Sequence, residues 1–300
     1  MLTYKEEWAR EPYSKIPPEN YLIPHLGQRK LLIAEIDFLN NYGDMSNEVV
    51  YAGAGPGYHI AKLADLFPRK IFYLYDPREF APELAEYKNI YLHQEYFTDE
   101  IAAKYKGSGV LFISDIRTAE KSGGDFEEEV IANLEQQARW CNIMKPKMAS
   151  LKFRMPFKTG EIEYFDGIIR LQAWVGIDSA ETRLWTTCKN KKKYIYEEYS
   201  EKMFYFNRHL RLGPYRCGQP ECMDYCNDCA IEWQVWREYY GKRKFNIDCE
   251  EFTIGPHGKL RDLPLKQRIK QLKPETLQFY NLYLKNEDNK IKLNKKIFRN

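Results

Sequence analysis

The 300-residue sequence has no long apolar run. No stretch approaches the roughly 18 consecutive apolar residues of a membrane-spanning helix. The polar residues 1–20 contain no apolar segment of the kind found in a signal peptide. Internal repeats and low-complexity tracts are also lacking. These absences predict a soluble intracellular chain with no membrane partner, and its 44% hydrophobic residues are enough for a sizeable core.

The sequence also lacks a strong excess of either charge. Its 46 Lys and Arg residues face 43 Asp and Glu residues, which leaves a formal net charge of +3. Global charge therefore gives no argument for a nucleic-acid partner, so any basic contact surface must be local. The lysines of residues 189–193 and the basic tail of residues 290–299 are the two candidates. The lysines predict either a solvated surface or an RNA-binding surface, and the tail predicts either a solvated end or a basic handle for RNA or an acidic partner.

Seven cysteines are an odd number, which argues against a disulfide framework in a chain of this length. Cys141, Cys188 and Cys249 are scattered and are interpreted as reduced residues. The other four crowd together at Cys217, Cys222, Cys226 and Cys229. This cluster predicts either a tetrahedral structural zinc site or reduced cysteines without a ligand. A third hypothesis is an iron–sulfur cluster, because the last three follow the spacing of radical S-adenosylmethionine enzymes.

Short apolar segments alternate with helical segments and predict an α/β fold. The expected strands are 48–53, 71–75, 90–92, 110–113, 149–153, 168–175 and 182–188. The expected helices are one that opens at Gly27, one through Ile60 and Leu66, and those at 126–144, 197–210, 228–241 and 264–284. This order predicts a mixed, mostly parallel sheet flanked by helices. The last three strands lack long intervening helices and predict its antiparallel edge.

Proline content and helical pattern divide the chain into three parts. Residues 1–26 contain four prolines and predict an irregular N-terminal arm. Residues 27–210 hold the α/β core. Residues 211–300 predict a helical C-terminal extension that packs on the core and ends in the basic tail.

Three alternating glycines, Gly53, Gly55 and Gly57, form the turn between the first strand and its helix. Glycine lets the backbone approach a ligand closely and adopt positive φ, and the helix start offers free N–H groups. The dinucleotide fingerprint requires a glycine where Tyr58 stands, and no Lys followed by Ser or Thr forms a P-loop. The turn therefore predicts either an S-adenosylmethionine site, with Asp76 for the ribose hydroxyls, or merely a tight strand-to-helix turn.

Four charged residues lie at predicted strand or helix ends. Asp115 ends the fourth strand, where open α/β sheets place ligands, and Lys152 lies within an apolar strand. Glu181 begins another strand, and Lys30 lies near the start of the first helix. Burial and a neighbouring cation lower a lysine pKa, whereas carboxylates raise it. If the four converge, a lysine could deprotonate a sugar hydroxyl for methyl transfer. Taken singly, each is more simply interpreted as an ordinary edge charge or ion pair.

Five ordered segments resemble one known family. They are 27–32, 51–60, 113–117, 150–157 and 179–184. They look like the poxvirus-type cap-specific mRNA 2′-O-methyltransferase, which also serves as the stimulatory subunit of viral poly(A) polymerase. The resemblance implies a Rossmann-like methyltransferase fold, S-adenosylmethionine as cofactor and capped mRNA as substrate. It further implies a poly(A) polymerase catalytic subunit as partner, and a cytoplasmic location, in host cytoplasm or virion if the protein is viral.

The resemblance also implies roles for single residues. Lys152 is expected to be the general base of a tetrad with Lys30, Asp115 and Glu181. Phe157 matches the aromatic residue that stacks on the methylated guanine of the cap. Two further cap-binding candidates depart from the family pattern: the expected acid falls on Ser200, with Glu201 one residue on, and Tyr13 is only close to the expected tyrosine of the arm. The residues expected around the cofactor are Gln28, Tyr51, Gly53, Gly57, His59, Asp76, Arg78, Phe97, Asp115 and Arg117.

The sequence departs from the family at the cap pocket. Asp178 stands where the family has a second cap-stacking tyrosine. Trp174 or Trp185 is an alternative second stacking face, against the simpler interpretation that both belong to the core. Two other functions stay open. One is a non-catalytic RNA-binding or processivity subunit of a polyadenylation machine, and the other is an FtsJ-type methyltransferase of ribosomal RNA, which uses the same tetrad.

Overall fold

The computed structural model describes residues 3–14, 27–117, 126–176, 178–211 and 227–243. Its centre is a seven-stranded sheet with the strand order β3-β2-β1-β4-β5-β8-β7, and β6 and β9 form a separate two-stranded sheet. The strands are β1 (Glu48–Ala52), β2 (Ile71–Tyr75), β3 (Ile90–His93), β4 (Leu111–Ser114), β5 (Met148–Phe153), β6 (Glu161–Phe165), β7 (Ile168–Arg170), β8 (Thr182–Thr186) and β9 (Lys191–Ile195).

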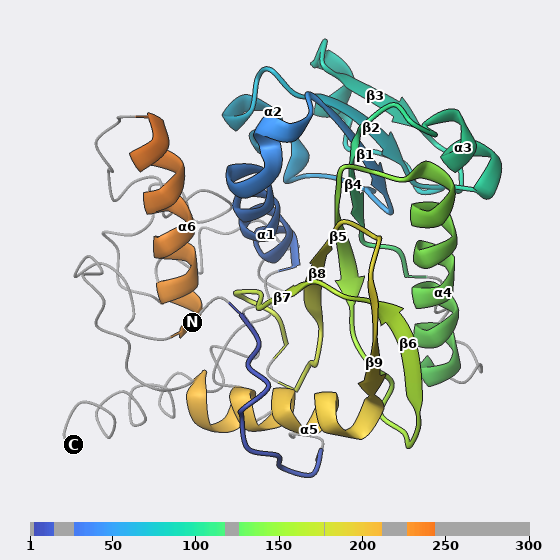
Figure 1. The fold of residues 1–300 in the computed structure, drawn as a ribbon. Helices are drawn as coiled ribbons and strands as arrows, with labels where there is room; N and C mark the ends of the chain where they lie inside the picture. Colours follow the sequence, from blue (N-terminus) through green and yellow to red (C-terminus); the bar gives the residue numbers. More distant parts are fainter. Residues whose placement is uncertain (1–2, 15–26, 118–125, 177, 212–226, 244–300) are drawn as a thin grey trace.

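Helices cover both faces of the large sheet. Figure 1 shows α1 and α2 on one side of the sheet and α3 and α4 on the other. The helices are α1 (Gly27–Tyr42), η2 (Gly43–Met45), α2 (Ile60–Leu66), η3 (Pro82–Glu86), α3 (Asp99–Lys104), α4 (Phe126–Met144), α5 (Tyr196–Tyr205), η4 (Phe206–Leu210) and α6 (Asn227–Arg243). Among these described helices, none has the length and apolar character needed to cross a membrane.

The predicted α/β class and the mixed, mostly parallel sheet are confirmed. Strands β1 to β5 pair in parallel, and β8 is antiparallel to both β5 and β7. The predicted antiparallel edge is confirmed, because β8 pairs antiparallel with both β5 and β7, while β5 also pairs in parallel with β4. The long helix α4 connects β4 to β5 and returns the chain to the same end of the sheet, which makes this pair parallel. The predicted strand 168–175 ends at Arg170, and Trp174 has a φ of 62°, which extended backbone does not allow.

Strands β6 and β9 were not predicted, because half of their residues are Glu or Lys, which are depleted in strands. The two strands pair through charge complementarity. Lys193 Nζ lies 2.7 Å from Glu161, and Lys191 Nζ lies 3.5 Å from Glu163. Lys192 contacts Glu6 of the N-terminal segment at 3.2 Å. The basic cluster at 189–193 is therefore largely matched by acids on adjacent segments.

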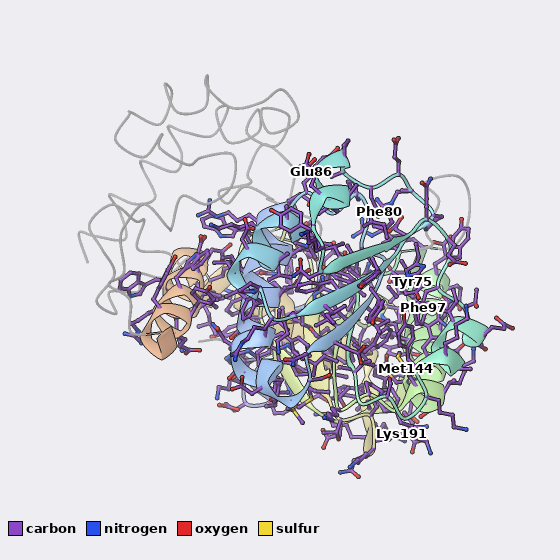
Figure 2. All side chains as sticks on the ribbon, turned by 90° about the horizontal axis from the view of Figure 1, so that it is seen from above. Tyr75, Phe80, Glu86, Phe97, Met144 and Lys191 are labelled. Atoms are coloured by element: carbon purple, nitrogen blue, oxygen red, sulfur yellow. The ribbon has the colours of Figure 1, made fainter. Side chains whose placement is uncertain are left out.

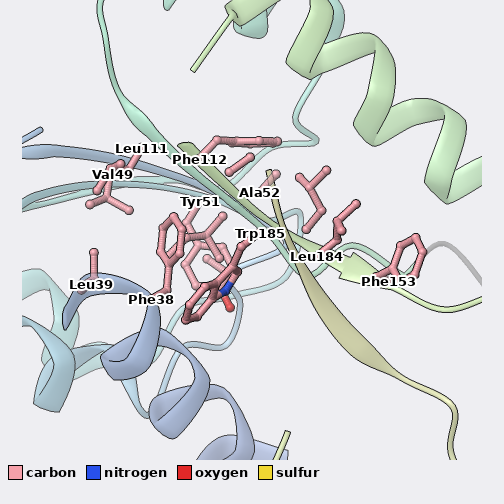
Figure 3. Packing of buried hydrophobic residues seen from close by; sticks show 14 of the residues in the cluster. Phe38, Leu39, Val49, Tyr51, Ala52, Leu111, Phe112, Phe153, Leu184 and Trp185 are labelled. Carbon is pink, nitrogen blue, oxygen red and sulfur yellow. The ribbon is translucent and has the colours of Figure 1, made fainter. Parts of the chain in front are cut away.

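The apolar core fills the space on both sides of the sheet. On one side, Phe38 of α1 packs against Trp185 of β8, and their ring centroids are 5.8 Å apart. On the other side, Phe112 of β4 packs with Trp140 of α4. Figure 3 shows Phe38 and Trp185 together near the helix, with Phe112 across the sheet. This packing fixes the position of α1 relative to the ends of β4, β5 and β8.

Helix α6 is attached to the core by buried ion pairs. Arg211 and Asp228 form a bidentate pair whose side chains are both 0% exposed. Arg29 of α1 donates to both carboxylate oxygens of Glu232, at 2.9 and 2.6 Å. Trp236 of the same helix is fully buried. Ion pairs this deep hold their partners in one geometry, because neither charge can return to water while the helix stays docked.

We predict that Asp228→Asn lowers the free energy of unfolding by about 3–5 kcal/mol, since it leaves the Arg211 guanidinium buried without its counter-charge. Glu11→Gln is the matched control. Its pair with Arg208 is exposed and should contribute at most about 1 kcal/mol. Urea denaturation of both variants measures the difference. Equal losses would contradict a special role for the buried pair.

Candidate active site

The four residues predicted to form a tetrad come together at the carboxyl ends of the parallel strands. Lys30, in the first turn of α1, donates a hydrogen bond to Glu181, which directly precedes β8. Lys152 Nζ of β5 lies 3.2 Å from Asp115 Oδ1 and 3.6 Å from Glu181 Oε2. Asp115 follows β4, the central strand of the sheet. One amine thus lies between two carboxylates, one of which also binds the second amine.

Burial and charge act in opposite directions on these groups. Burial is the largest influence on Lys152, and it lowers the pKa of the amine, although Asp115 and Glu181 raise it. Burial raises the pKa of Glu181, but the charges of Lys152, Lys30 and Arg183 outweigh it and hold that pKa well below its usual range. The pKa of Asp115 is lowered in the same way, against burial, by Lys152 and Arg183. Both carboxylates therefore stay ionised beside an amine that loses its proton more easily than usual.

Arg183 completes the charge cluster, and the sequence analysis gave it no role. Its guanidinium donates to Asp115 Oδ1 at 2.6 Å, to the Ser114 carbonyl at 3.0 Å and to Gln172 at 3.0 Å. Arg183 lies directly opposite Lys152 in the β5–β8 pair, so both side chains share one face of the sheet. The signal available in the sequence was an arginine inside the predicted strand 182–188, where a charged residue is unusual.

A hollow that is partly open to solvent lies beside the tetrad. The lining includes Lys152, Glu181 and Arg117, together with the apolar residues Ile116 and Leu134. The hollow lies toward α4 and β5, whereas the glycine turn lies on the other side of β4, between β1 and α2. The tetrad therefore has a space on the side opposite the turn.

The glycine turn has the geometry that its sequence predicts. Gly53 and Gly57 have φ of 80° and 76°, a region that favours glycine. A Cβ at Gly53 would lie 2.8 Å from the carbonyl carbon of Asp115, and one at Gly55 would lie 2.8 Å from Cγ of Asp76. The turn thus lies directly against two residues of the predicted site, and no larger residue fits at either position.

Asp76 lies at the end of β2, as predicted, but its carboxylate already accepts four hydrogen bonds. Its donors are the N–H of Gly55 at 2.9 Å and, from Arg78, the N–H at 2.9 Å and the guanidinium at 2.9 and 3.0 Å. Four donors fill the acceptor capacity of one carboxylate. A ribose could bind Asp76 only after the Arg78 side chain moves, and that side chain is 64% exposed.

The remaining residues predicted around the cofactor lie near this turn or near the tetrad. Gln28 and Tyr51 are linked to His59, directly or through Glu35, just beyond the turn. Arg117 Nη2 lies 3.6 Å from Glu181, so it borders the tetrad. Phe97 is buried edge-on against Tyr75 at the end of β2, with ring centroids 5.1 Å apart. Figure 2 shows Tyr75 and Phe97 close together.

Two residues predicted to bind the cap are in direct contact. Tyr13 stacks on Phe157, with ring centroids 3.9 Å apart and an angle of 17° between the planes. The Arg154 guanidinium lies 4.4 Å from the Phe157 ring centroid and is held by Glu127. Glu201 lies on α5, where its carboxylate accepts a hydrogen bond from Arg10 at 2.7 Å. The N-terminal segment therefore reaches both Phe157 and Glu201.

Neither tryptophan that was considered as a second stacking face occupies that position. Trp185 is buried against Phe38 and Tyr42, with Arg170 over its ring. Trp174 donates through its indole N–H to Glu232 of α6 at 2.7 Å. Both rings are committed to packing, and Tyr13 is the ring that faces Phe157.

The predicted metal site falls outside the described residues. Cys217, Cys222 and Cys226 are not among them, and the side chain of Cys229 is not described either. Within the described ranges, no group of His, Cys, Asp or Glu side chains is arranged to hold a metal ion. Zinc binding at the cysteine cluster thus stays a prediction from the sequence.

The fold and the site together define a Rossmann-like α/β protein of the methyltransferase class, with a glycine turn after β1 and charged residues at the strand ends. The chain belongs to the poly A polymerase regulatory subunit family, whose model matches residues 2–254. The family membership predicted from the five ordered segments is therefore confirmed.

Named proteins are similar to this chain. The chain is 29% identical over 232 residues to the cap-specific mRNA (nucleoside-2′-O-)-methyltransferase of Myxoma virus (strain Lausanne), covering 70% of this chain and 67% of that protein. It is 29% identical over 238 residues to the protein of the same name from Fowlpox virus (strain NVSL), covering 70% and 76%. A solved structure, bluetongue virus VP4, described as a multifunctional RNA-capping production line, aligns with a TM-score of 0.49 and 14% identity, covering 78% of this chain and 37% of VP4.

We predict that Asp115→Asn lowers the pKa of Lys152 further, because the substitution removes the carboxylate charge that most raises it. NMR titration of isotopically labelled lysine side chains measures the change, with the Lys152 signal assigned by its loss in Lys152→Met. The Lys70 signal is an internal control. Burial lowers its pKa too, but its amine donates to Ser46 and Gly43, away from Asp115. An unchanged or raised Lys152 pKa would show that Asp115 does not control this amine.

Proposed function

We propose that this chain is an S-adenosylmethionine-dependent methyltransferase that methylates the 2′-hydroxyl of the cap-adjacent nucleotide of mRNA. The convergence of Lys30, Asp115, Lys152 and Glu181 carries the proposal. The names of the Myxoma and Fowlpox relatives support the same reaction and the same substrate.

Lys152 is the general base of the proposed reaction. A ribose hydroxyl is a weak nucleophile, so the proton on its 2′-oxygen must move to a base as the new bond to carbon forms. Burial lowers the pKa of Lys152 and raises the fraction of neutral amine that can accept this proton. Asp115 and Glu181 orient the amine, at 3.2 and 3.6 Å, and stabilise the ammonium form once the proton has arrived. Lys30 and Arg183 balance the charge of these two carboxylates.

The glycine turn and the residues next to it are the proposed cofactor site. S-adenosylmethionine supplies a methyl group that is activated by a positively charged sulfur. The turn packs against two residues of the proposed site, because Gly53 lies on the backbone of Asp115 and Gly55 lies on the side chain of Asp76. Asp76 would hold the ribose hydroxyls after Arg78 turns outward. Gln28, Tyr51 and His59 would border the amino-acid end, and Arg117 and Phe97 would lie toward the remainder of the cofactor.

Tyr13 and Phe157 are the proposed faces of the cap pocket. The methylated guanine of a cap carries a positive charge, and aromatic faces attract flat cations. In the structure the two rings stack on each other, so a base would enter between them by displacing Tyr13. Tyr13 lies on the N-terminal segment, and the opening requires movement of that segment and not of a strand. Glu201 would take part only by releasing Arg10.

Family membership supports a second role, as an accessory subunit of a poly(A) polymerase. In this role the catalytic polymerase chain would be a partner and RNA a shared ligand. The intact tetrad argues against the accessory role as the sole function, because a purely structural subunit has no need for a buried, charge-balanced amine. A methyltransferase of the FtsJ type would have the same tetrad but no use for the Tyr13–Phe157 pair.

Methyl transfer to RNA tests the proposed reaction directly. The wild-type protein should transfer labelled methyl groups to capped RNA, and Lys152→Ala should lose at least about a hundredfold in kcat, as expected for removal of a general base. Lys104→Ala, an exposed lysine on α3, is the matched control and should retain full activity. Full activity of Lys152→Ala would eliminate Lys152 as the base. Transfer equal on capped, uncapped and ribosomal RNA would favour the FtsJ-type alternative, and no transfer to any of them would refute the enzyme.

The cap pocket makes a separate prediction. Phe157→Ala should raise KM for capped RNA about tenfold or more, because stacking on an aromatic residue contributes about 1–3 kcal/mol per base. Its affinity for S-adenosylmethionine should not change. Tyr91→Ala, an exposed aromatic residue on β3, serves as the control and should alter neither value. A KM for capped RNA that Phe157→Ala leaves unchanged would place the cap elsewhere.

A further inference from the structure

Glu35 occupies a buried position between the glycine turn and helix α1. Its residue is only 4% exposed, and its Oε1 accepts two hydrogen bonds. The Tyr51 hydroxyl donates at 2.7 Å, and His59 Nε2 donates at 3.0 Å. Neither the glycine motif nor the tetrad includes this carboxylate.

The two donors lie at opposite ends of the turn. Tyr51 is in the last part of β1, just before Gly53, and His59 directly precedes α2. Glu35 therefore joins the strand that enters the turn to the helix that leaves it. Gln28 adds a second link, because its side-chain oxygen accepts the His59 backbone N–H at 3.3 Å and lies 2.8 Å from His59 Nδ1.

Glu35 and Lys30 belong to the same helix. Glu35 comes five positions after Lys30, which corresponds to a rise of about 7.5 Å along the axis of an α-helix. A helix transmits a shift along its axis almost rigidly, so the contacts of Glu35 with the turn also set the height of Lys30 beside Glu181. The glycine turn also contacts Asp115, because Gly53 packs on the Asp115 backbone. One carboxylate thus links both ends of the turn to two members of the tetrad.

We infer that Glu35 is a positioning residue that couples cofactor binding at the glycine turn to the placement of Lys30 in the tetrad. The inference rests on the proposed function for the identity of the cofactor and of the reaction. Glu35 acts through Tyr51, His59 and the helix, and it needs no contact with either substrate. Its loss lowers both the affinity for S-adenosylmethionine and the rate at saturating substrates.

Asp37 offers a matched control on the same helix. It is equally buried, at 4% exposure, and its carboxylate accepts two hydrogen bonds from Arg170 of β7, at 3.0 and 2.6 Å. These contacts tie α1 to the opposite edge of the sheet, away from the turn. Removing either carboxylate charge costs stability, but only Glu35 is linked to the cofactor turn.

The test compares Glu35→Gln with Asp37→Asn in the full chain. Calorimetry measures binding of S-adenosylmethionine, kinetics on capped RNA separate KM from kcat, and thermal unfolding reports stability. Both variants should unfold at lower temperature. Glu35→Gln should weaken S-adenosylmethionine binding about tenfold and lower kcat about tenfold, the size of one buried hydrogen bond to a charged group. Asp37→Asn should change neither value by more than about twofold, within the scatter of a remote site.

Wild-type affinity and kcat in Glu35→Gln would overturn the inference, and so would equal losses in Asp37→Asn, since the effect would then follow stability alone.

A double variant that combines Glu35→Gln with Tyr51→Phe gives a further test. If Glu35 acts through Tyr51, the double variant should lose less affinity for the cofactor than the sum of the two single losses, and full additivity would contradict the coupling. Cofactor binding is measured without RNA. A protein that binds S-adenosylmethionine but methylates no RNA would refute the proposed function while leaving the role of Glu35 in binding open to the same comparison.

Discussion

The site depends on an excess of buried positive charge at one edge of the sheet. Lys30, Lys152 and Arg183 face two carboxylates, Asp115 and Glu181. Lys30, Arg183 and Glu181 are buried, and the side chains of Lys152 and Asp115 are 16% and 15% exposed. Two ionised acids cannot fully neutralise three cations at these distances, and a lysine can lose its charge where an arginine cannot. Arg183 takes the shortest measured contact to Asp115, at 2.6 Å, while Lys152 is held at 3.2 Å. Lys152 is therefore the cation that loses its charge most easily, because burial lowers the pKa of its amine.

The parts of this arrangement that follow from local sequence could be predicted, and the parts that depend on pairing between distant segments could not. The strand ends at Ser114 and Phe153 mark where apolar runs stop, and topology then brings Asp115 and Lys152 together. The role of Arg183 depends on the register of an antiparallel pair, which sets it opposite Lys152. Periodicity contains no information on that register. The charged strand at Lys191 escaped detection for a related reason, because its stability comes from the acids opposite it and not from its own strand propensity.

The N-terminal segment shows how an irregular stretch can still have a defined course. Tyr4 stacks on Tyr199, and Trp8 stacks on Phe206 with an angle of only 10° between the rings. Polar residues of the same segment pair with α5 and η4, as in the contact of Glu11 with Arg208. These anchors direct the chain to Tyr13 and its contact with Phe157. Prolines in the sequence indicated the lack of regular structure, but the aromatic anchors have no periodic pattern, so the position of Tyr13 could not be predicted from spacing.

The first turn of α1 is held from two sides, which links α6 to the four residues of the tetrad. Successive residues of an α-helix point about 100° apart, so Arg29 and Lys30 reach different neighbours. Arg29 binds Glu232 of α6, and Lys30 binds Glu181. Trp174, in the segment that leads to Glu181, also donates to Glu232. Glu232 therefore contacts both the helix that carries Lys30 and the loop that precedes Glu181, so a displacement of α6 would move both partners of that ion pair together.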